Sequence, residues 1–428
     1  MRLVCAPENF NFAEDGALNV VLYGQPGEIR DDRSARASAG QAAKTDFIRA
    51  GYNATPRAWD FLSIALSVIT ADLAGQREES ADNWTREFDI KIAVADPIFW
   101  NTQATALEAA LKFLSTDRWQ LTFESGGHIP SPPKKPVQPD EDCVVLLSGG
   151  LDSLIGAIDL AATNKKPLAV SNIVRGDGEN QEEFAKTIGG GLRHIALNHN
   201  ATPPGKKEPS QRARSLIFIA FGVLAATSLK KYHNGQEVPF YICENGFIAI
   251  NPPLTGGRIG SLSTRTVHPE FLNRIRDILI AADLRVRIIN PYEHCTKGEM
   301  LKNCRDQKLL KSLAIKSVSC GRYRVFNYTQ CGRCVPCQVR RAAFLAWGNA
   351  DLTSYKYSNI GLRNDEHANF DDVRSIAMAI ADVNTNGLES WLGAALAYPK
   401  IGIKPPLKDL VSRGLKELAA LHLQQGIR

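Results

Sequence analysis

The chain has no apolar run long enough to cross a membrane. Its longest nearly apolar stretch, residues 216–226, is interrupted only by Gly222, whereas a spanning helix needs about 20 apolar residues. That stretch predicts a buried helix. The opening residues MRLVCAPENF contain no basic segment followed by an apolar run, so nothing marks export and a cytoplasmic protein without membrane contact is expected.

The chain also lacks repeats, low-complexity tracts and an extreme charge. Of its 428 residues, 44% are hydrophobic and 22% charged, with 33 glycines, 22 prolines and a formal net charge of +6. This balance excludes collagen-like, mainly disordered and coiled-coil proteins, and the length predicts two or three domains. The modest positive charge permits a nucleic-acid partner without requiring one.

A proline-rich segment divides the chain. Residues 128–142 contain five prolines and no apolar periodicity, which predicts a stiff, exposed linker at 129–141. Before it, the apolar patterns predict helices at 56–75 and 105–114 and strands at 87–94 and 119–123. We therefore expect an N-terminal α+β module at 1–128, which carries no motif of recognisable chemistry.

After the linker, short apolar runs alternate with helical patterns. The strands are predicted at 143–147, 168–174, 239–243 and 284–290, with helices such as 215–230 between them. This alternation favours an α/β fold at 142–349, with a parallel sheet covered by helices on both faces. Periodic segments at 371–383 and 407–424 predict a helical C-terminal extension at 350–428.

A glycine-containing turn follows the first of these strands. It reads Ser148, Gly149, Gly150, Leu151, Asp152, Ser153 and opens a helix expected at 154–160. Backbone N–H groups and the helix dipole can converge there on a phosphate, with hydroxyl donors from the two serines and Mg²⁺ held by Asp152. The alternative is an ordinary turn with Asp152 as a helix cap. No GxxxxGK[ST] segment occurs, so the loop suits a leaving pyrophosphate better than γ-phosphate transfer.

Four of the nine cysteines crowd into one short segment. Cys320, Cys331, Cys334 and Cys337 have the spacing C-x10-C-x2-C-x2-C, which suits a closed, structural zinc site. An iron–sulfur cluster and unconnected core cysteines are the alternatives. The other five cysteines lack partner spacing and are predicted to be buried small apolar residues.

Taken together, these motifs carry a family resemblance. SGGLDS after a strand resembles the N-type ATP pyrophosphatases, or PP-loop enzymes, which cleave ATP between its α- and β-phosphates. The cysteine cluster, followed by Arg340, Arg341 and Phe344, narrows the resemblance to the QueC family of 7-cyano-7-deazaguanine synthases. The resemblance spans residues 142–347, with further similar stretches at 214–217, 269–271 and 291–299. It implies the fold of the adenine nucleotide alpha hydrolases.

The chain departs from the biosynthetic QueC enzymes at two places. Residues 265–268 stand where the family usually has Tyr-Pro-Asp-Cys-Arg, and 171–177 lack its Gln-Arg-His pattern. Both departures lie where the substrate should be recognised. The resemblance therefore implies adenylation more firmly than it implies a particular acceptor. The longer architecture resembles the QueC-like proteins of bacterial antiphage operons of the Qat type, which implies a protein partner from the same operon.

The resemblance assigns roles to particular residues. Residues 148–153 would bind ATP, and Asp152, Lys297 and Arg214 would act in catalysis, although Lys297 could be a solvated lysine at a helix start and Arg214 part of a surface ion pair. Substrate contacts are expected from Glu244, Asn245, Gly246, Arg265 and His268, against an ordinary turn for the first three and loop stabilisation for the last two. The implied cofactors are ATP, Mg²⁺ and structural Zn²⁺.

The predicted function is adenylation of a carboxylate on a small deazapurine, such as 7-carboxy-7-deazaguanine, for attack by an amine. AMP and pyrophosphate would be released, and nucleic acid would not be required. Two alternatives stay open. One is a PP-loop enzyme of the RNA-thiolation type, and the other is a catalytically silent nucleotide-binding subunit of a defence complex.

Overall fold

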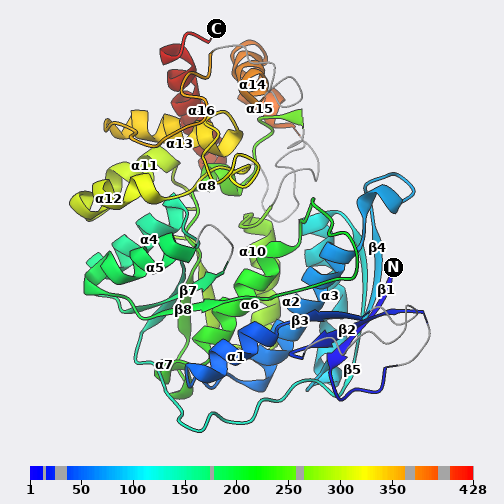
Figure 1. Ribbon diagram of the computed structural model, residues 1–428. Coiled ribbons are helices and arrows are strands. Elements are labelled where there is room, and N and C mark those ends of the chain that lie inside the picture. Colours follow the sequence, from blue (N-terminus) through cyan, green and yellow to red (C-terminus); the bar gives the residue numbers. More distant parts are fainter. Residues whose placement is uncertain are drawn as a thin grey trace.

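Two parallel sheets of five strands organise the chain (Figure 1). The computed structural model describes residues 1–12, 16–24, 36–173, 178–256, 265–361, 372–393 and 405–427. The strands are β1 Arg2–Pro7, β2 Leu18–Leu22, β3 Arg36–Ala39, β4 Glu87–Val94, β5 Arg118–Ser125, β6 Cys143–Leu146, β7 Pro167–Asn172, β8 His194–Leu197, β9 Val238–Tyr241 and β10 Val286–Ile289.

Helices surround both sheets. They are α1 Gln41–Arg49, α2 Pro56–Ala74, α3 Pro97–Ser115, α4 Leu151–Ala162, α5 Gly178–Thr187, α6 Arg214–Ala226, α7 Lys230–His233, α8 Gly246–Ala249, α10 Pro269–Ala281, α11 Lys297–Asn303, α12 Gln307–Leu313, α13 Val335–Trp347, α14 Asp372–Asn386, α15 Leu388–Leu392 and α16 Pro405–Gln424. Among the described residues, no helix combines the length and apolar character needed to cross a membrane.

The N-terminal sheet corrects one prediction. Its strand order is β3-β2-β1-β4-β5 and each of its strand pairs is parallel, so this part of the chain is α/β and the expected α+β module is wrong. Strands β4 and β5 and helices α2 and α3 confirm the predicted elements. The misassignment arose because β1, β2 and β3 are short, and β3 (RASA) has no apolar run.

The second sheet confirms the predicted parallel α/β arrangement. Its order is β10-β9-β6-β7-β8, and β6, β7, β9 and β10 lie within the predicted segments, give or take one residue at an end. Residue 174, included in the prediction for β7, lies outside the described residues. From β6 the chain first builds outward through β7 and β8, then crosses to β9 and β10. The strand order therefore reverses between β6 and β9, where open α/β sheets bind ligands at the carboxyl ends of their strands.

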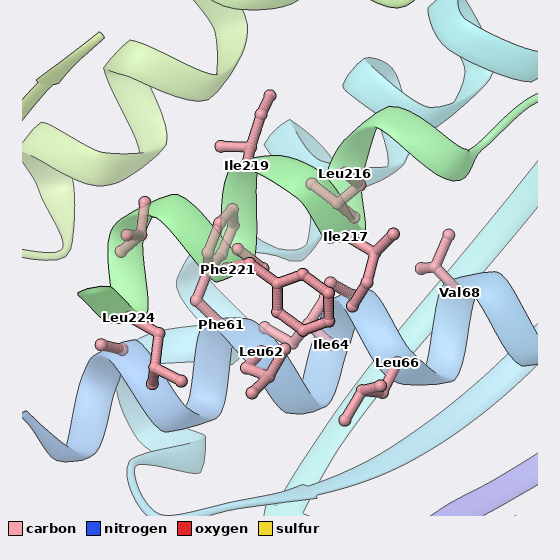
Figure 2. Packing of buried hydrophobic residues seen from close by; sticks show 14 of the residues in the cluster. Phe61, Leu62, Ile64, Leu66, Val68, Leu216, Ile217, Ile219, Phe221 and Leu224 are labelled. Atoms are coloured by element: carbon pink, nitrogen blue, oxygen red, sulfur yellow. The ribbon is translucent and has the colours of Figure 1, made fainter. Parts of the chain in front are cut away.

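Helices α2 and α6 lie side by side and join the two sheets through one core. Figure 2 shows apolar side chains of α2, such as Phe61 and Leu62, close to Ile217 and Phe221 of α6. Helix α2 also packs on β2, β3 and β4, and α6 packs on β6, β7 and β9. Residues from both sheets belong to the same hydrophobic cluster, so burial of these two helices links the N-terminal sheet to the sheet that carries the predicted site.

The proline-rich segment at 128–142 contains no helix or strand, as its sequence predicts. It is held to the surface by backbone contacts: the Val137 N–H donates to the Gly51 carbonyl at 2.7 Å, and the Lys230 N–H donates to the Pro139 carbonyl at 2.9 Å. The predicted C-terminal helices are confirmed as α14 and α16. With α11, α12, α13 and α15 they gather at one end of the molecule (top of Figure 1).

Candidate functional site

The predicted phosphate loop is a tight turn between β6 and α4. Gly149 has φ +83°, a conformation that favours glycine. The Gly150 N–H donates to the Ser148 hydroxyl at 3.2 Å, and the two serine hydroxyls lie 3.0 Å apart. Ser153 also donates to the Gly150 carbonyl at 3.0 Å and accepts from the Ser148 N–H at 3.2 Å. The Ser153 hydroxyl therefore braces the loop itself, which the sequence did not indicate.

Asp152 is buried in the first turn of α4. There it binds Asn245, which precedes α8, and Lys297, which begins α11. The Asn245 side-chain amide donates to its carboxylate at 2.8 Å, the Asn245 backbone N–H donates at 3.2 Å, and Lys297 forms an ion pair with it. The Lys297 and Asp152 side chains are only 8% and 6% exposed. Asp152 is therefore not a simple helix cap, and Lys297 is not a solvated lysine.

The electrostatics of this cluster shift the pKa values of Asp152 and Glu244 in opposite directions. Burial raises the pKa of Asp152, but the Lys297 ammonium and the hydrogen bonds around it outweigh that effect and hold the pKa below its usual value. Burial and the adjacent Asp152 carboxylate raise the pKa of Glu244 well above its usual value. The cluster thus favours the ionised form of Asp152 and the protonated form of Glu244.

Asn245 and Gly246 have internal partners at the position where a purine contact was predicted. The Asn245 side-chain oxygen accepts the Ile248 N–H at 3.0 Å and caps α8 while its amide nitrogen holds Asp152. A Cβ on Gly246 would lie 2.0 Å from the Glu293 carbonyl oxygen, so this position requires glycine. These contacts make both residues part of the support for Asp152.

Arg214 stands at the first position of α6, beside a cavity of about 150 Å³ that reaches the phosphate loop. The cavity is lined by Leu146, Leu147, Ser148, Val170, Ser171, Asn172, Gln181, Arg214, Phe218 and Phe221. Gln181 donates to the carbonyls of Ser148 and Asn172, both at 3.2 Å. Sequence reasoning missed Gln181 and Asn172, because neither belongs to a local motif and only the fold brings them to Ser148.

Arg265 and His268 contact the N-terminal half of the chain. Arg265 donates to the Phe113 carbonyl of α3 at 2.9 Å, and the His268 ring lies 5.0 Å from the Phe113 ring, centre to centre. His268 also caps α10 by accepting the Glu270 N–H at 3.2 Å, and burial lowers its pKa to about 3. These contacts fit loop stabilisation, the alternative considered above for both residues.

The four predicted metal-binding cysteines are buried and meet at one point. Their sulfur atoms all lie within 4.8 Å of one another, with 3.9 Å between Cys331 and Cys337 and between Cys334 and Cys320. Tetrahedral zinc with Zn–S bonds of 2.3 Å requires sulfurs about 3.8 Å apart. The cluster can therefore hold a metal ion such as zinc. The remaining cysteines are free thiols, buried except for the half-buried Cys295.

The cysteine cluster is connected to the phosphate loop through residues 317–319. The Val318 N–H donates to the Gly149 carbonyl at 3.0 Å. Gln330, next to Cys331, donates to the Ser317 carbonyl at 3.2 Å and accepts the Ser319 N–H at 3.1 Å. Buried Arg340 also donates to the Ser317 carbonyl at 3.2 Å. The cluster thus has a short covalent and hydrogen-bonded route to the loop.

Comparison of the sequence with protein-family models and with curated proteins gives no match. The function is therefore inferred from the geometry of the loop at 148–153, the Asp152 cluster and the four cysteines.

Proposed function

We propose that the chain is a QueC-like, ATP-dependent enzyme that adenylates a carboxylate for attack by an amine. The observation that carries the proposal is the buried ion pair of Asp152 and Lys297 beside the loop at 148–153. It lies between β6 and β9, where the strand order reverses and a ligand-binding crevice is expected. A buried charge pair is costly to maintain for stability alone, and clusters of this kind favour functional sites.

The reaction proceeds in two displacements. A carboxylate oxygen of the substrate attacks the α-phosphorus of ATP, the bond from that phosphorus to the β-bridging oxygen breaks, and pyrophosphate leaves. The amine nitrogen then attacks the carboxyl carbon of the acyl-adenylate. The carbon–oxygen bond to AMP breaks, the nitrogen loses a proton and an amide is formed. AMP makes the carboxyl oxygen a good leaving group, so the protein mainly provides alignment and charge stabilisation.

The loop and the ion pair supply those two contributions. Backbone N–H groups at the start of α4 and the hydroxyl of Ser148 are suited to hold the departing phosphates. Lys297 neutralises developing negative charge, and Arg214, on the cavity wall, can pair with a phosphate or a carboxylate through its planar guanidinium. The ionised Asp152 carboxylate offers the oxygen ligands that Mg²⁺ prefers. Mg²⁺ bound there would stabilise the pyrophosphate.

The four cysteines would hold Zn²⁺ in a structural role, because a closed four-sulfur site leaves no position for a substrate. We further propose a deazapurine carboxylate as the substrate and a cytoplasmic antiphage system of the Qat type as the setting. An amine on a partner protein from the same operon would then accept the acyl group. The substrate depends on the resemblance described for residues 142–347, whereas the setting and the partner depend on the resemblance of the longer architecture to the QueC-like proteins of antiphage operons.

The decisive experiment measures AMP and pyrophosphate release. The protein is incubated with labelled ATP, Mg²⁺, 7-carboxy-7-deazaguanine and either ammonia or the operon partners. Release that is abolished by Asp152→Asn but retained by Asp140→Asn, a change at an exposed carboxylate, supports adenylation. No release in any mixture overturns it, and nucleotide binding without turnover selects a silent subunit. Iron in place of zinc in a coloured protein would instead favour RNA thiolation.

A further inference from the structure

The C-terminal helix α16 contacts the start of α11, the helix that begins with Lys297. One Glu417 carboxylate oxygen accepts a hydrogen bond from the Thr296 hydroxyl, and the other accepts the Gly298 N–H at 3.3 Å. Thr296 and Gly298 are the neighbours of Lys297 on either side. A single side chain of α16 therefore binds the Thr296 side chain and the Gly298 backbone, the two neighbours of the lysine that pairs with Asp152.

Two more contacts hold the first turn of α11 and the segment that precedes it. Arg413, one helical turn before Glu417, forms an ion pair with Glu299 and donates to the His294 carbonyl at 3.1 Å. A Cβ on Gly298 would lie 2.4 Å from a Glu417 carboxylate oxygen. The absence of a side chain at position 298 thus allows the carboxylate to approach the α11 backbone.

The same helix also packs against the loop that carries Asn245. A Cβ on Gly246 would lie 2.8 Å from a Leu410 methyl group, and a Cβ on Gly414 would lie 2.4 Å from the Phe247 ring. Helix α16 therefore touches both segments that bind Asp152 from outside the phosphate loop. It is part of the framework of the site, although it is remote from that site in sequence.

We propose that Glu417 is a positioning residue that orients Lys297 toward Asp152 by holding Thr296 and Gly298. The proposal rests on the proposed function only for its effect on catalysis, because the orientation of Lys297 can be measured by itself. Without the Glu417 carboxylate, Thr296 and Gly298 each lose a hydrogen bond. The Lys297 ammonium between them can then leave the buried ion pair more easily.

The test compares wild-type protein with Glu417→Ala, Glu417→Gln and the neighbouring surface change Lys416→Ala. An amine-acylating reagent labels lysines, and peptide mass spectrometry follows the rate at Lys297. We expect the rate to rise about tenfold or more in Glu417→Ala and to stay at the wild-type level in Lys416→Ala. Glu417→Gln keeps one of the two acceptor oxygens, so its Lys297 labelling rate should lie between those of the other two variants. This variant replaces Glu417→Ala in the test if the alanine variant does not fold.

Catalysis supplies the second readout. Because a misplaced catalytic group lowers the rate without removing ground-state binding, kcat for AMP release should fall about 10²-fold in Glu417→Ala, with KM for ATP changed less than about threefold. Equal Lys297 labelling in wild type and both Glu417 variants would overturn the positioning role. If the wild-type protein releases no AMP, the proposed function fails and the labelling rates alone decide the role of Glu417.

Discussion

Val318 and Gly149 are joined by a backbone hydrogen bond of 3.0 Å, which links the segment before the cysteine cluster to the phosphate loop. Gly149 is the loop residue with φ +83°. A contact at this point fixes the orientation of the peptide group that follows it. The segment before the cluster and the loop are therefore directly connected, although Gly149 and Val318 lie 169 positions apart in the sequence.

This link predicts that loss of the metal weakens nucleotide binding. Metal ligation by four cysteines contributes about 10–16 kcal/mol of folding energy in small zinc domains. Cys331→Ser should release the segment at 317–319, lower the melting temperature by about 10 °C and raise the Kd for ATP about tenfold. Calorimetry and nucleotide titration measure both effects. Cys295→Ser, at a half-buried cysteine outside the cluster, is the matched control, and an unchanged Kd in Cys331→Ser would contradict the link.

The ion pair of Asp152 and Lys297 predicts that removing both charges restores stability lost in the single variants but does not restore activity. Asp152→Asn or Lys297→Met alone leaves an uncompensated buried charge and should cost about 3–5 kcal/mol of unfolding free energy. The double variant leaves neither charge and should regain most of that stability while releasing no AMP. Urea unfolding of the four proteins provides the measurement. Additive losses in the double variant would show that the two side chains are not coupled.

Burial of His268 predicts a loss of stability in acid. Its pKa is lowered from 6.5 to about 3 in the folded protein, so the unfolded chain binds the proton first as the pH falls. The neutral ring therefore contributes stability that is present above pH 6.5 and is lost as the pH falls toward 3.

The size of this effect follows from proton linkage. Between pH 6 and pH 4 the wild-type protein should lose about 1.4 kcal/mol per pH unit relative to His268→Asn. The asparagine oxygen can accept the Glu270 N–H in place of the His268 ring nitrogen and so cap α10. Urea unfolding of both proteins across this range measures the difference. Parallel pH profiles would contradict the burial of a neutral His268, and the difference also separates its effect from those of the other histidines.

Gly246 predicts a sharp intolerance to a single methyl group. Gly246→Ala places a Cβ 2.0 Å from the Glu293 carbonyl oxygen, so the backbone carrying Asn245 must move. We expect a cost of about 1–3 kcal/mol in unfolding free energy and a loss of AMP release, measured by urea unfolding and by AMP assay. In Gly256→Ala, where no atom of the described residues lies within 4 Å of the new Cβ, both quantities should remain at wild-type values.

Local patterns predicted much of the second half of the fold. Helix α6 and strands β6, β7 and β9 were predictable because elements that are mostly buried are marked by apolar runs. Strand β10 was predictable although its Arg287 is exposed. Strands β1–β3 and β8 were not, since runs of four to six residues with mixed composition carry too little periodicity. The pairing of β1, β2 and β3 is non-local, and it makes the N-terminal sheet parallel.

The candidate site likewise contains some residues that the sequence indicates and others that only the structure reveals. The loop at 148–153 and the four cysteines are local motifs, so their residue types and spacing are sufficient to single them out as candidates. The structure brings the four cysteines together, while phosphate binding by the loop stays a prediction. Gln181 and Glu417 carry no such motif, and their importance follows only from the segments they contact. Asn245 was expected to contact a substrate, whereas the structure pairs it with Asp152 and the start of α8. Arg265 and His268 looked like substrate contacts from their polar surroundings, whereas the structure directs both toward Phe113.

The amino-acid sequence by itself determined the chemistry available to this protein: a turn of serine and glycine ahead of a helix, four thiols at metal-binding spacing, and apolar strands for a parallel sheet. Only the tertiary structure decided which groups meet. Lys297 and Asn245 reach Asp152, Val318 reaches Gly149, and α16 braces the whole arrangement, because these contacts depend on strand order and helix packing between segments far apart in the chain. Such contacts leave no periodic trace in any one segment.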